Sequence, residues 1–280
     1  MPVELSALGA AALAAAGAAG LYATAIEPSL LRLREPHVAS RWWPIERPPA
    51  RIGVLSDLHA SWPMMTVDRV RSIVKRLLAA EPELILLAGD FVSTHTRLVR
   101  ALPIEPVAEA LAALAAAAPT FAVLGNHDWY YGGPRVARAL TANGIRVLAN
   151  EAVRVELRGG GLWLAGLDDA WTGRADPARA LAYVDRGAPV VLLSHVPDPF
   201  PRLPPEVALT VAGHTHGGQV WVPGYGPLRT GTRLPRRFAY GLSERAGRHL
   251  YVSGGVGTTA IPIRFWRPPE IALLTLGGEG

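Results

Sequence analysis

Five short apolar runs in the chain each end in side chains that can bind metal ions, and this pattern constrains the fold more than any other feature. In the clearest case, apolar residues 121–124 lead into Asn126, His127 and Asp128. Such runs predict buried strands, and polar residues at strand carboxyl ends gather at one edge of an α/β sheet. The other four runs lead into Asp57 and His59, Asp90, His195, and His214 with His216.

A single histidine after a strand is more often a hydrogen-bonded structural residue than a metal ligand. The five endings together favour metal binding, because two Asp, one Asn and four His at one place would repel one another or lack partners without cations. The chain has no cysteine, so imidazole, carboxylate and amide groups would have to bind the metal. These ligands suit Mn²⁺, Fe or Zn²⁺, and we expect Mn²⁺ to support activity in vitro.

The order of these motifs resembles the calcineurin-like metallophosphoesterases, over roughly residues 50 to 276. Residues 26–28 and the segment 257–265 are similar to the bacterial membrane-associated branch that includes the YkuE-like and YaeI-like phosphoesterases. The resemblance implies a four-layer α/β/β/α sandwich of two mixed sheets, preceded by one N-terminal apolar helix. The motifs that carry it are Asp57-x-His59, Gly89-Asp90, Gly125-Asn126-His127-Asp128, His195 and Gly213-His214-x-His216.

The same resemblance implies two divalent metal ions. Asp90 would bridge them, since a carboxylate has two oxygens and can bind both ions. The other implied ligands are Asp57, His59 and His216 for the first ion, and Asn126, His195 and His214 for the second.

The resemblance also implies catalytic and substrate-binding residues. His127 would contact the phosphate or protonate the leaving group, with Asp128 orienting it. A simple helix or turn cap is an equally good interpretation of Asp128. Asn126 would contact substrate as well as metal. Arg264 could pair with a substrate phosphate or, alternatively, with a nearby Glu.

The implied reaction is hydrolysis of a phosphodiester or pyrophosphate by a hydroxide that bridges the metals. Aromatic residues adjoin the motifs, among them Trp62, Trp129, Trp221 and Trp266. One interpretation is an apolar rim that admits a lipid-linked phosphodiester, although packing in the core is the more common role for any single residue. The wider resemblance implies the finer expectation, because some members cleave the pyrophosphate of UDP-2,3-diacylglucosamine. A phosphomonoesterase and a non-catalytic scaffold on the same fold are the alternatives. A single domain with one anchor would work as a monomer.

Residues 5–26 are free of charge and long enough to cross a bilayer. We expect a membrane-anchor helix at 1–28, a Pro-rich linker at 29–49 and the catalytic domain at 50–280. A cleaved signal peptide is the alternative, with Ala23-Thr24-Ala25 as its cleavage site, but Glu4 stands where a signal peptide has positive charge.

The distribution of charge predicts location and partners. Arg32, Arg34 and Arg41 follow the apolar segment and no Lys or Arg precedes it. By the positive-inside rule, the protein would be a single-pass protein of the inner membrane with its catalytic domain on the cytoplasmic side. The net charge of +5 suits an anionic partner, but the chain has no basic run of the nucleic-acid-binding kind, so we expect no specific nucleic acid.

Overall fold

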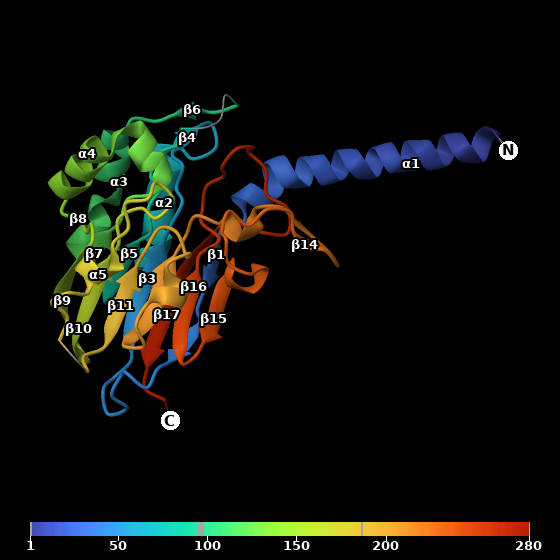
Figure 1. Cartoon of the computed structure of the whole chain (residues 1–280). Coiled ribbons are helices and arrows are strands. Elements are labelled where there is room, and N and C mark those ends of the chain that lie inside the picture. Colours follow the sequence, from blue (N-terminus) through green and yellow to red (C-terminus); the bar gives the residue numbers. More distant parts are fainter. Residues whose placement is uncertain (1, 95–97, 186, 280) are drawn as a thin grey trace.

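The computed structural model describes residues 2–94, 98–185 and 187–279. Two β-sheets lie against each other, with the larger helices on the outer face of one of them (Figure 1). The predicted α/β sandwich of two mixed sheets is confirmed.

The first sheet has seven strands in the order β1-β17-β3-β5-β7-β8, and β2 also pairs with β17. β3, β5, β7 and β8 run parallel to one another, whereas β17 runs antiparallel to β3. The strands are β1 (Arg32–Arg34), β2 (His37–Ala39), β3 (Ala50–Leu55), β5 (Leu84–Leu87), β7 (Thr120–Ala122), β8 (Arg146–Val147) and β17 (Glu270–Gly277).

The second sheet has six strands in the order β15-β16-β12-β11-β10-β9. Its four central strands are parallel, and the two edge strands are antiparallel to their neighbours. The strands are β9 (Glu151–Leu157), β10 (Gly160–Gly166), β11 (Val190–Leu193), β12 (Val207–Ala212), β15 (Gly241–Arg245) and β16 (Arg248–Val252).

The central strands are buried on both faces, which explains why they are continuous apolar runs. Val54 of β3 packs in the core between the two sheets, together with Val191 and Val211 of the second sheet. The next residue, Leu55, points the other way and packs under the helices. Because successive side chains of a strand point to opposite faces, one apolar run contributes to both apolar layers.

Three helices cover the outer face of the first sheet: α2 (Val67–Leu78), α3 (Ile104–Ala117) and α4 (Asn126–Ala142). Thr66 caps α2, as its sequence predicts, by accepting a hydrogen bond from the Arg69 N–H at 3.3 Å. The outer face of the second sheet is covered more thinly. Its buried residues pack against the short α5 (Pro177–Ala180) and the 3-10 turns η3 (Phe200–Arg202) and η5 (Arg236–Phe238).

An apolar helix, α1 (Pro2–Leu21), projects away from the two sheets (Figure 1). It continues through the π-helical turn η1 (Tyr22–Ile26) into the 3-10 turn η2 (Glu27–Ser29). The span Ala7–Ser29 is long and apolar enough to cross a membrane. The one predicted N-terminal apolar helix is therefore present.

Residues 29–49 were predicted to be a linker, and the structure contradicts this. β1 and β2 lie within this segment and both pair in parallel with β17. Val38 and Trp43, which belong to this segment, are buried in the core, with exposed fractions of 2% and 1%. The prolines of this segment, at positions 36, 44, 48 and 49, lie outside both strands, so they remove no hydrogen bond from the sheet. The partner strand lies near the other end of the chain, so local composition could not reveal the pairing.

Candidate metal centre

Residues from both sheets meet at the edge formed by the carboxyl ends of the parallel strands. On the first sheet, Asp57 and His59 follow β3, Asp90 follows β5, and Asn126 begins α4 after β7. From the second sheet, His195 follows β11, and His214 with His216 follow β12. Six of these seven side chains are buried, and His214 is partly exposed. The predicted convergence of the five strand endings is therefore what the structure shows.

The backbone at these residues is strained. A positive φ is uncommon outside glycine and costs free energy, so such residues cluster where function requires an unusual geometry. Eleven residues other than glycine have positive φ in the described part of the chain. Five of them are in this cluster: Asp57 (54°), His59 (45°), Asp90 (58°), His214 (69°) and His216 (52°).

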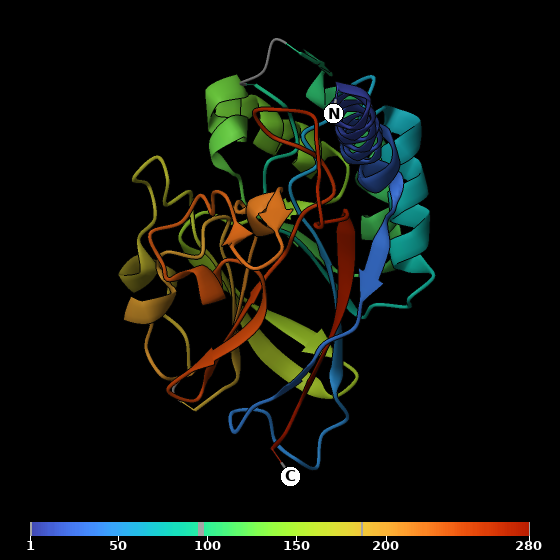
Figure 2. The same ribbon diagram turned by 90° about the vertical axis from the view of Figure 1, so that its right-hand side faces the viewer.

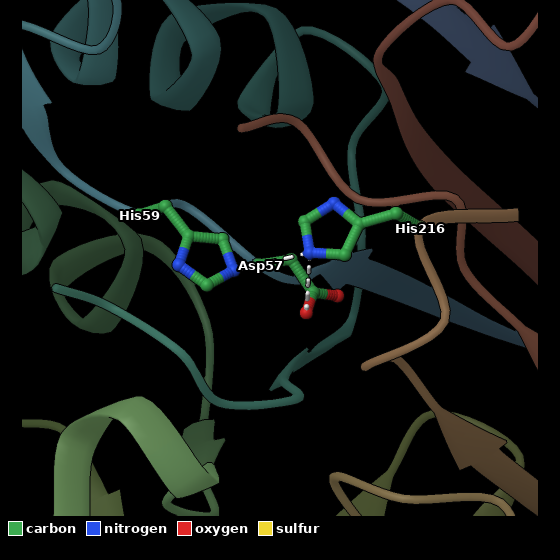
Figure 3. A group of neighbouring side chains, drawn as sticks. All are labelled: Asp57, His59 and His216. Atoms are coloured by element: carbon green, nitrogen blue, oxygen red, sulfur yellow. Dashed lines mark hydrogen bonds and ion pairs between the residues drawn. The ribbon is translucent and has the colours of Figure 1, made fainter. Parts of the chain in front are cut away.

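The first group of possible ligands is Asp57, His59 and His216 (Figure 3). The Nε2 atoms of the two histidines lie 3.1 Å apart, and His216 Nε2 lies 3.6 Å from Asp57 Oδ1. Ser56 donates a hydrogen bond of 2.5 Å to the other oxygen of Asp57. Three ligand atoms of N and O type thus face one small volume, which fits a divalent cation.

The second group is Asp90, His195 and His214. His195 Nε2 lies 3.2 Å from Asp90 Oδ2, 3.1 Å from His214 Nδ1 and 3.2 Å from the side-chain oxygen of Asn126. The same Asp90 Oδ2 lies 3.5 Å from His59 Nε2 in the first group. A single carboxylate therefore stands between the two groups, where a bridging ligand has to be.

Three of the four histidines are in the protonation state that cation binding requires. Burial lowers the pKa of His59 and of His214 to about 3 and holds that of His216 well below its usual range. These imidazoles are therefore neutral and offer lone pairs. Burial opposes charge on Asp90 and His195 as well, but their mutual attraction outweighs it. It keeps the pKa of Asp90 well below its usual range and raises the pKa of His195 to about 10.

Close packing at two glycines brings the loops together. A Cβ at Gly125 would lie 2.2 Å from Asp90 Oδ1, and one at Gly213 would lie 1.9 Å from Ser56 Oγ. Any larger residue would push the neighbouring loop away. Glycine thus lets the backbone approach its neighbours closely at these two positions.

His127 lies beside the first group, with its ring centroid 4.6 Å from that of His59. Its Nδ1 lies 2.8 Å from Thr94 Oγ1, and its Nε2 lies 3.5 Å from Thr259 Oγ1. Sequence reasoning missed both threonines as partners, because a hydroxyl group has no characteristic spacing. The similarity of segment 257–265 to relatives was the only signal that included Thr259.

The hydrogen bonds of Asp128 differ from those expected of a residue that orients His127. Its carboxylate accepts hydrogen bonds from the backbone N–H groups of Asp90 (2.8 Å), Phe91 (2.8 Å) and Gly125 (2.9 Å). It therefore fixes the loop after β5 against the start of α4. The alternative interpretation of Asp128, as a local cap, describes these contacts better than the orienting role.

The surroundings of Arg264 also differ from those expected of a substrate-binding residue. It is fully buried, and its guanidinium donates to the backbone carbonyls of Gly254 (2.8 Å), Gly257 (3.0 Å) and Arg267 (2.9 Å). The prediction that Arg264 contacts a substrate phosphate is wrong for this arrangement, because its donors are already used. Only the tertiary structure could show this, since an arginine near a motif looks the same in sequence whether it is buried or free.

The two stacked sheets and the buried His/Asp cluster at their edge define a class of hydrolases that cleave phosphate esters with divalent metal ions. The chain belongs to the calcineurin-like phosphoesterases, and that family matches residues 50–218. It is accordingly a metal-dependent phosphoric ester hydrolase. The predicted family is confirmed.

Two bacterial relatives align with most of the chain. The uncharacterized metallophosphoesterase YkuE of Bacillus subtilis (strain 168) is 31% identical over 273 residues, which cover 96% of this chain and 93% of YkuE. The phosphodiesterase YaeI of Escherichia coli (strain K12) is 32% identical over 232 residues, or 81% of this chain and 82% of YaeI. The structure of a 5'-nucleotidase precursor from Thermus thermophilus aligns with a TM-score of 0.48 at 16% identity, over 81% of this chain and 55% of that one.

Proposed function

We propose that the protein is a membrane-anchored phosphodiesterase with a centre of two divalent metal ions. The observation that carries the proposal is the position of Asp90 Oδ2 between His59 and His195. In this proposal Asp90 bridges the ions. The remaining ligands are Asp57, His59 and His216 for the first ion, and Asn126, His195 and His214 for the second.

When bound, two divalent cations would activate a water molecule and offset the negative charge that develops on the phosphoryl group. The protein's own part is to hold the phosphate and move protons. His127 lies beside the first ligand group and within reach of Thr259, which suits a role in contacting the phosphate or protonating the leaving oxygen. Asn126 and His127 are the first residues of α4, where the positive end of the helix dipole favours an anion.

Manganese is our proposal for the metal, with Fe or Zn²⁺ as the alternatives, because ligands of nitrogen and oxygen only suit all three. A diester or pyrophosphate is our proposal for the substrate, in keeping with the name of the relative YaeI, a phosphodiesterase. A lipid-linked compound such as UDP-2,3-diacylglucosamine is the finer proposal, and it depends on membrane anchoring. A phosphomonoester is the alternative substrate.

Anchoring by a retained α1 is supported by how its end meets the folded domain. The Ala23 carbonyl accepts a 2.9 Å hydrogen bond from the Arg264 N–H, and Glu27 accepts one of 2.7 Å from the Trp266 N–H. Ala23 and Glu27 are both buried. Cleavage after residue 25 would remove the first of these contacts, so we favour an anchor at 1–28 over a signal peptide. We place the protein in the inner membrane with the catalytic domain, 50–280 together with strands β1 and β2, on the cytoplasmic side.

Hydrolysis of bis-p-nitrophenyl phosphate and of p-nitrophenyl phosphate by the full-length protein in detergent tests the proposal. The metal-stripped protein is assayed alone and with Mn²⁺, Zn²⁺ or Mg²⁺. We expect metal-dependent turnover that favours the diester and is strongest with Mn²⁺. Preference for the monoester would support the alternative. A folded, metal-loaded protein without turnover would point to the non-catalytic scaffold.

A further inference from the structure

Three segments that are distant in sequence join at the point where α1 leaves the domain. They are the turns that follow α1, the loop 217–228 and the loop 257–267. Tyr22 and Phe265 pack edge to face with centroids 6.1 Å apart, and the Trp221 N–H donates to the Phe265 carbonyl at 2.8 Å. The Gln219 side chain donates to the carbonyls of Thr259 (3.0 Å) and Ile261 (2.9 Å). We call the surface of these three segments the anchor face.

The anchor face exposes large apolar side chains around the base of α1. The exposed fractions are 54% for Trp266, 47% for Ile261 and 59% for Tyr225. Tyr225 lies in the hairpin of β13 (Trp221–Val222) and β14 (Gly226–Pro227), which projects from the domain on the same side as α1 (Figure 1). Turning the molecule so that this side faces the viewer shows α1 nearly end-on, with the hairpin facing the viewer as well (Figure 2).

The backbone holds Trp266 in place at a cost. Its φ is 57°, a conformation that is unfavourable for a bulky side chain. The hydrogen bond from its N–H to Glu27 and the stacking of its ring on Trp221, with centroids 6.0 Å apart, maintain this arrangement. A strained loop that keeps a tryptophan more than half exposed indicates that the exposed ring has a use.

Positive charge accompanies these aromatic rings. The Arg267 guanidinium lies 5.2 Å from the Trp221 ring centroid, and that of Arg236 lies 4.9 Å from the Tyr225 ring centroid. The segment 229–240, which directly follows the loop 217–228 of the anchor face, contains four arginines and neither Asp nor Glu. Aromatic rings next to arginines are typical of the headgroup region, where the rings enter the boundary with the acyl chains and the charges meet anionic lipids.

We infer that the anchor face is a membrane-contact surface for anionic phospholipid bilayers. This inference rests on the proposed anchoring by α1. The loop 257–267 belongs to the anchor face and also brings Thr259 to 3.5 Å from His127. The contact would therefore place the Thr259 side of the metal centre next to the lipid headgroups, where a phosphodiester carried on a lipid would reach it without leaving the bilayer.

The absence of cysteine allows a direct test with nitroxide labels at single introduced cysteines. The test variants are Trp266→Cys and Tyr225→Cys in the full-length chain. Tyr183→Cys is the matched control, because Tyr183 is an exposed aromatic residue (89%) outside the anchor face. Leu13→Cys, in α1, reports on the anchor itself. Each protein is reconstituted into vesicles of phosphatidylcholine and phosphatidylglycerol, and collision with dissolved oxygen is compared with collision with a water-soluble nickel chelate.

We expect the ratio of oxygen to nickel collisions at positions 225 and 266 to exceed that at position 183 by about twofold or more, since an interfacial surface enters the headgroup region. Position 13 should give the highest ratio. Values at 225 and 266 equal to that at 183, with 13 in lipid, would overturn the contact surface and leave the anchor standing. An equal response in pure phosphatidylcholine would overturn the preference for anionic lipid.

A low ratio of oxygen to nickel collisions at position 13 would show that α1 lies in water, and this result alone would overturn the anchor proposal. High ratios at 225 and 266 would then still support the surface, and low ratios would overturn it. Turnover of bis-p-nitrophenyl phosphate is measured on the same samples, so a failure of the catalytic proposal appears separately from either result.

Discussion

One carboxylate oxygen of Asp90, Oδ2, lies 3.2 Å from Nε2 of His195, so that a residue from the first sheet faces a residue from the second across the sandwich edge. The two side chains follow β5 and β11, which do not pair with each other. The centre consequently depends on how the two sheets are stacked, and Asp90 is the residue that links the two halves of the cluster.

Replacing Asp90 with Ala should therefore abolish turnover and leave the fold intact. We expect the rate to fall by about a thousandfold or more, because metal activation supplies several kcal/mol of transition-state stabilisation. The amount of bound metal, measured by atomic emission, should fall below the two ions per chain expected for the parent protein. Circular dichroism should match the parent protein. Retained activity would contradict the assignment of Asp90 as the bridge.

Metal binding at pH 8 should release one proton from His195. In the metal-free protein its pKa is about 10, whereas those of Asp57 and Asp128 are about 6 and about 7. At pH 8 the histidine is thus protonated and both carboxyl groups have already ionised. A cation has to displace the histidine proton, so affinity should rise by about tenfold per pH unit near pH 8 and level off above pH 10.

Calorimetric titration of the metal in buffers with different ionisation enthalpies measures this proton release. A His195→Gln variant should bind metal more weakly and release no proton. A parent protein that releases none at pH 8 would contradict the assignment of His195 as a ligand that must lose its proton.

Thr259→Val should slow turnover without affecting metal content. The hydroxyl lies 3.5 Å from His127 Nε2, and the loss of such a contact costs about 1 kcal/mol, or roughly a fivefold fall in kcat. Thr259→Ser keeps the hydroxyl and serves as the control. If both variants had the parent's kcat, Thr259 would have no part in positioning His127.

Arg264→Met should destabilise the protein, because it leaves several buried carbonyls without donors. We expect a loss of about 3–5 kcal/mol in the free energy of unfolding. Arg158→Met, at an exposed arginine whose side chain is 88% accessible, should cost little and is the matched control. Denaturant titration measures both. A stable Arg264→Met protein with a raised KM would instead support the original expectation of a phosphate contact.

Gly213→Ala should disrupt the first metal group. The new methyl carbon would lie 1.9 Å from Ser56 Oγ and 2.5 Å from Asp57 Oδ2, so Asp57 has to move. We expect one metal ion to be lost and about 1–3 kcal/mol of stability with it, which is usual for overpacking. Gly17→Ala in α1 meets no atom within 4 Å and should leave both quantities unchanged.

Much of the fold and of the cluster could be predicted from the sequence. A strand buried on both faces has to be apolar throughout, and the residues that follow it lie at the sheet edge, so Asp57, Asp90 and His195 were recognisable by position. Thr66 was recognisable as a cap for the same kind of local reason. Such inferences succeed because the pattern and its physical cause lie within a few neighbouring residues.

What only the tertiary structure decided depends on contacts between distant segments. Strands β1 and β2 join the first sheet because β17, at the far end of the chain, offers them an unpaired edge. The Asp128 carboxylate binds backbone N–H groups of the loop after β5. Arg264 donates to carbonyls of its own loop between β16 and β17, and the irregular course of that loop is not visible in its sequence. The sequence by itself determined which residues reach the sheet edge. Whether each side chain there is free or already partnered was decided by packing, because a hydrogen bond between distant segments leaves no periodic trace in the chain.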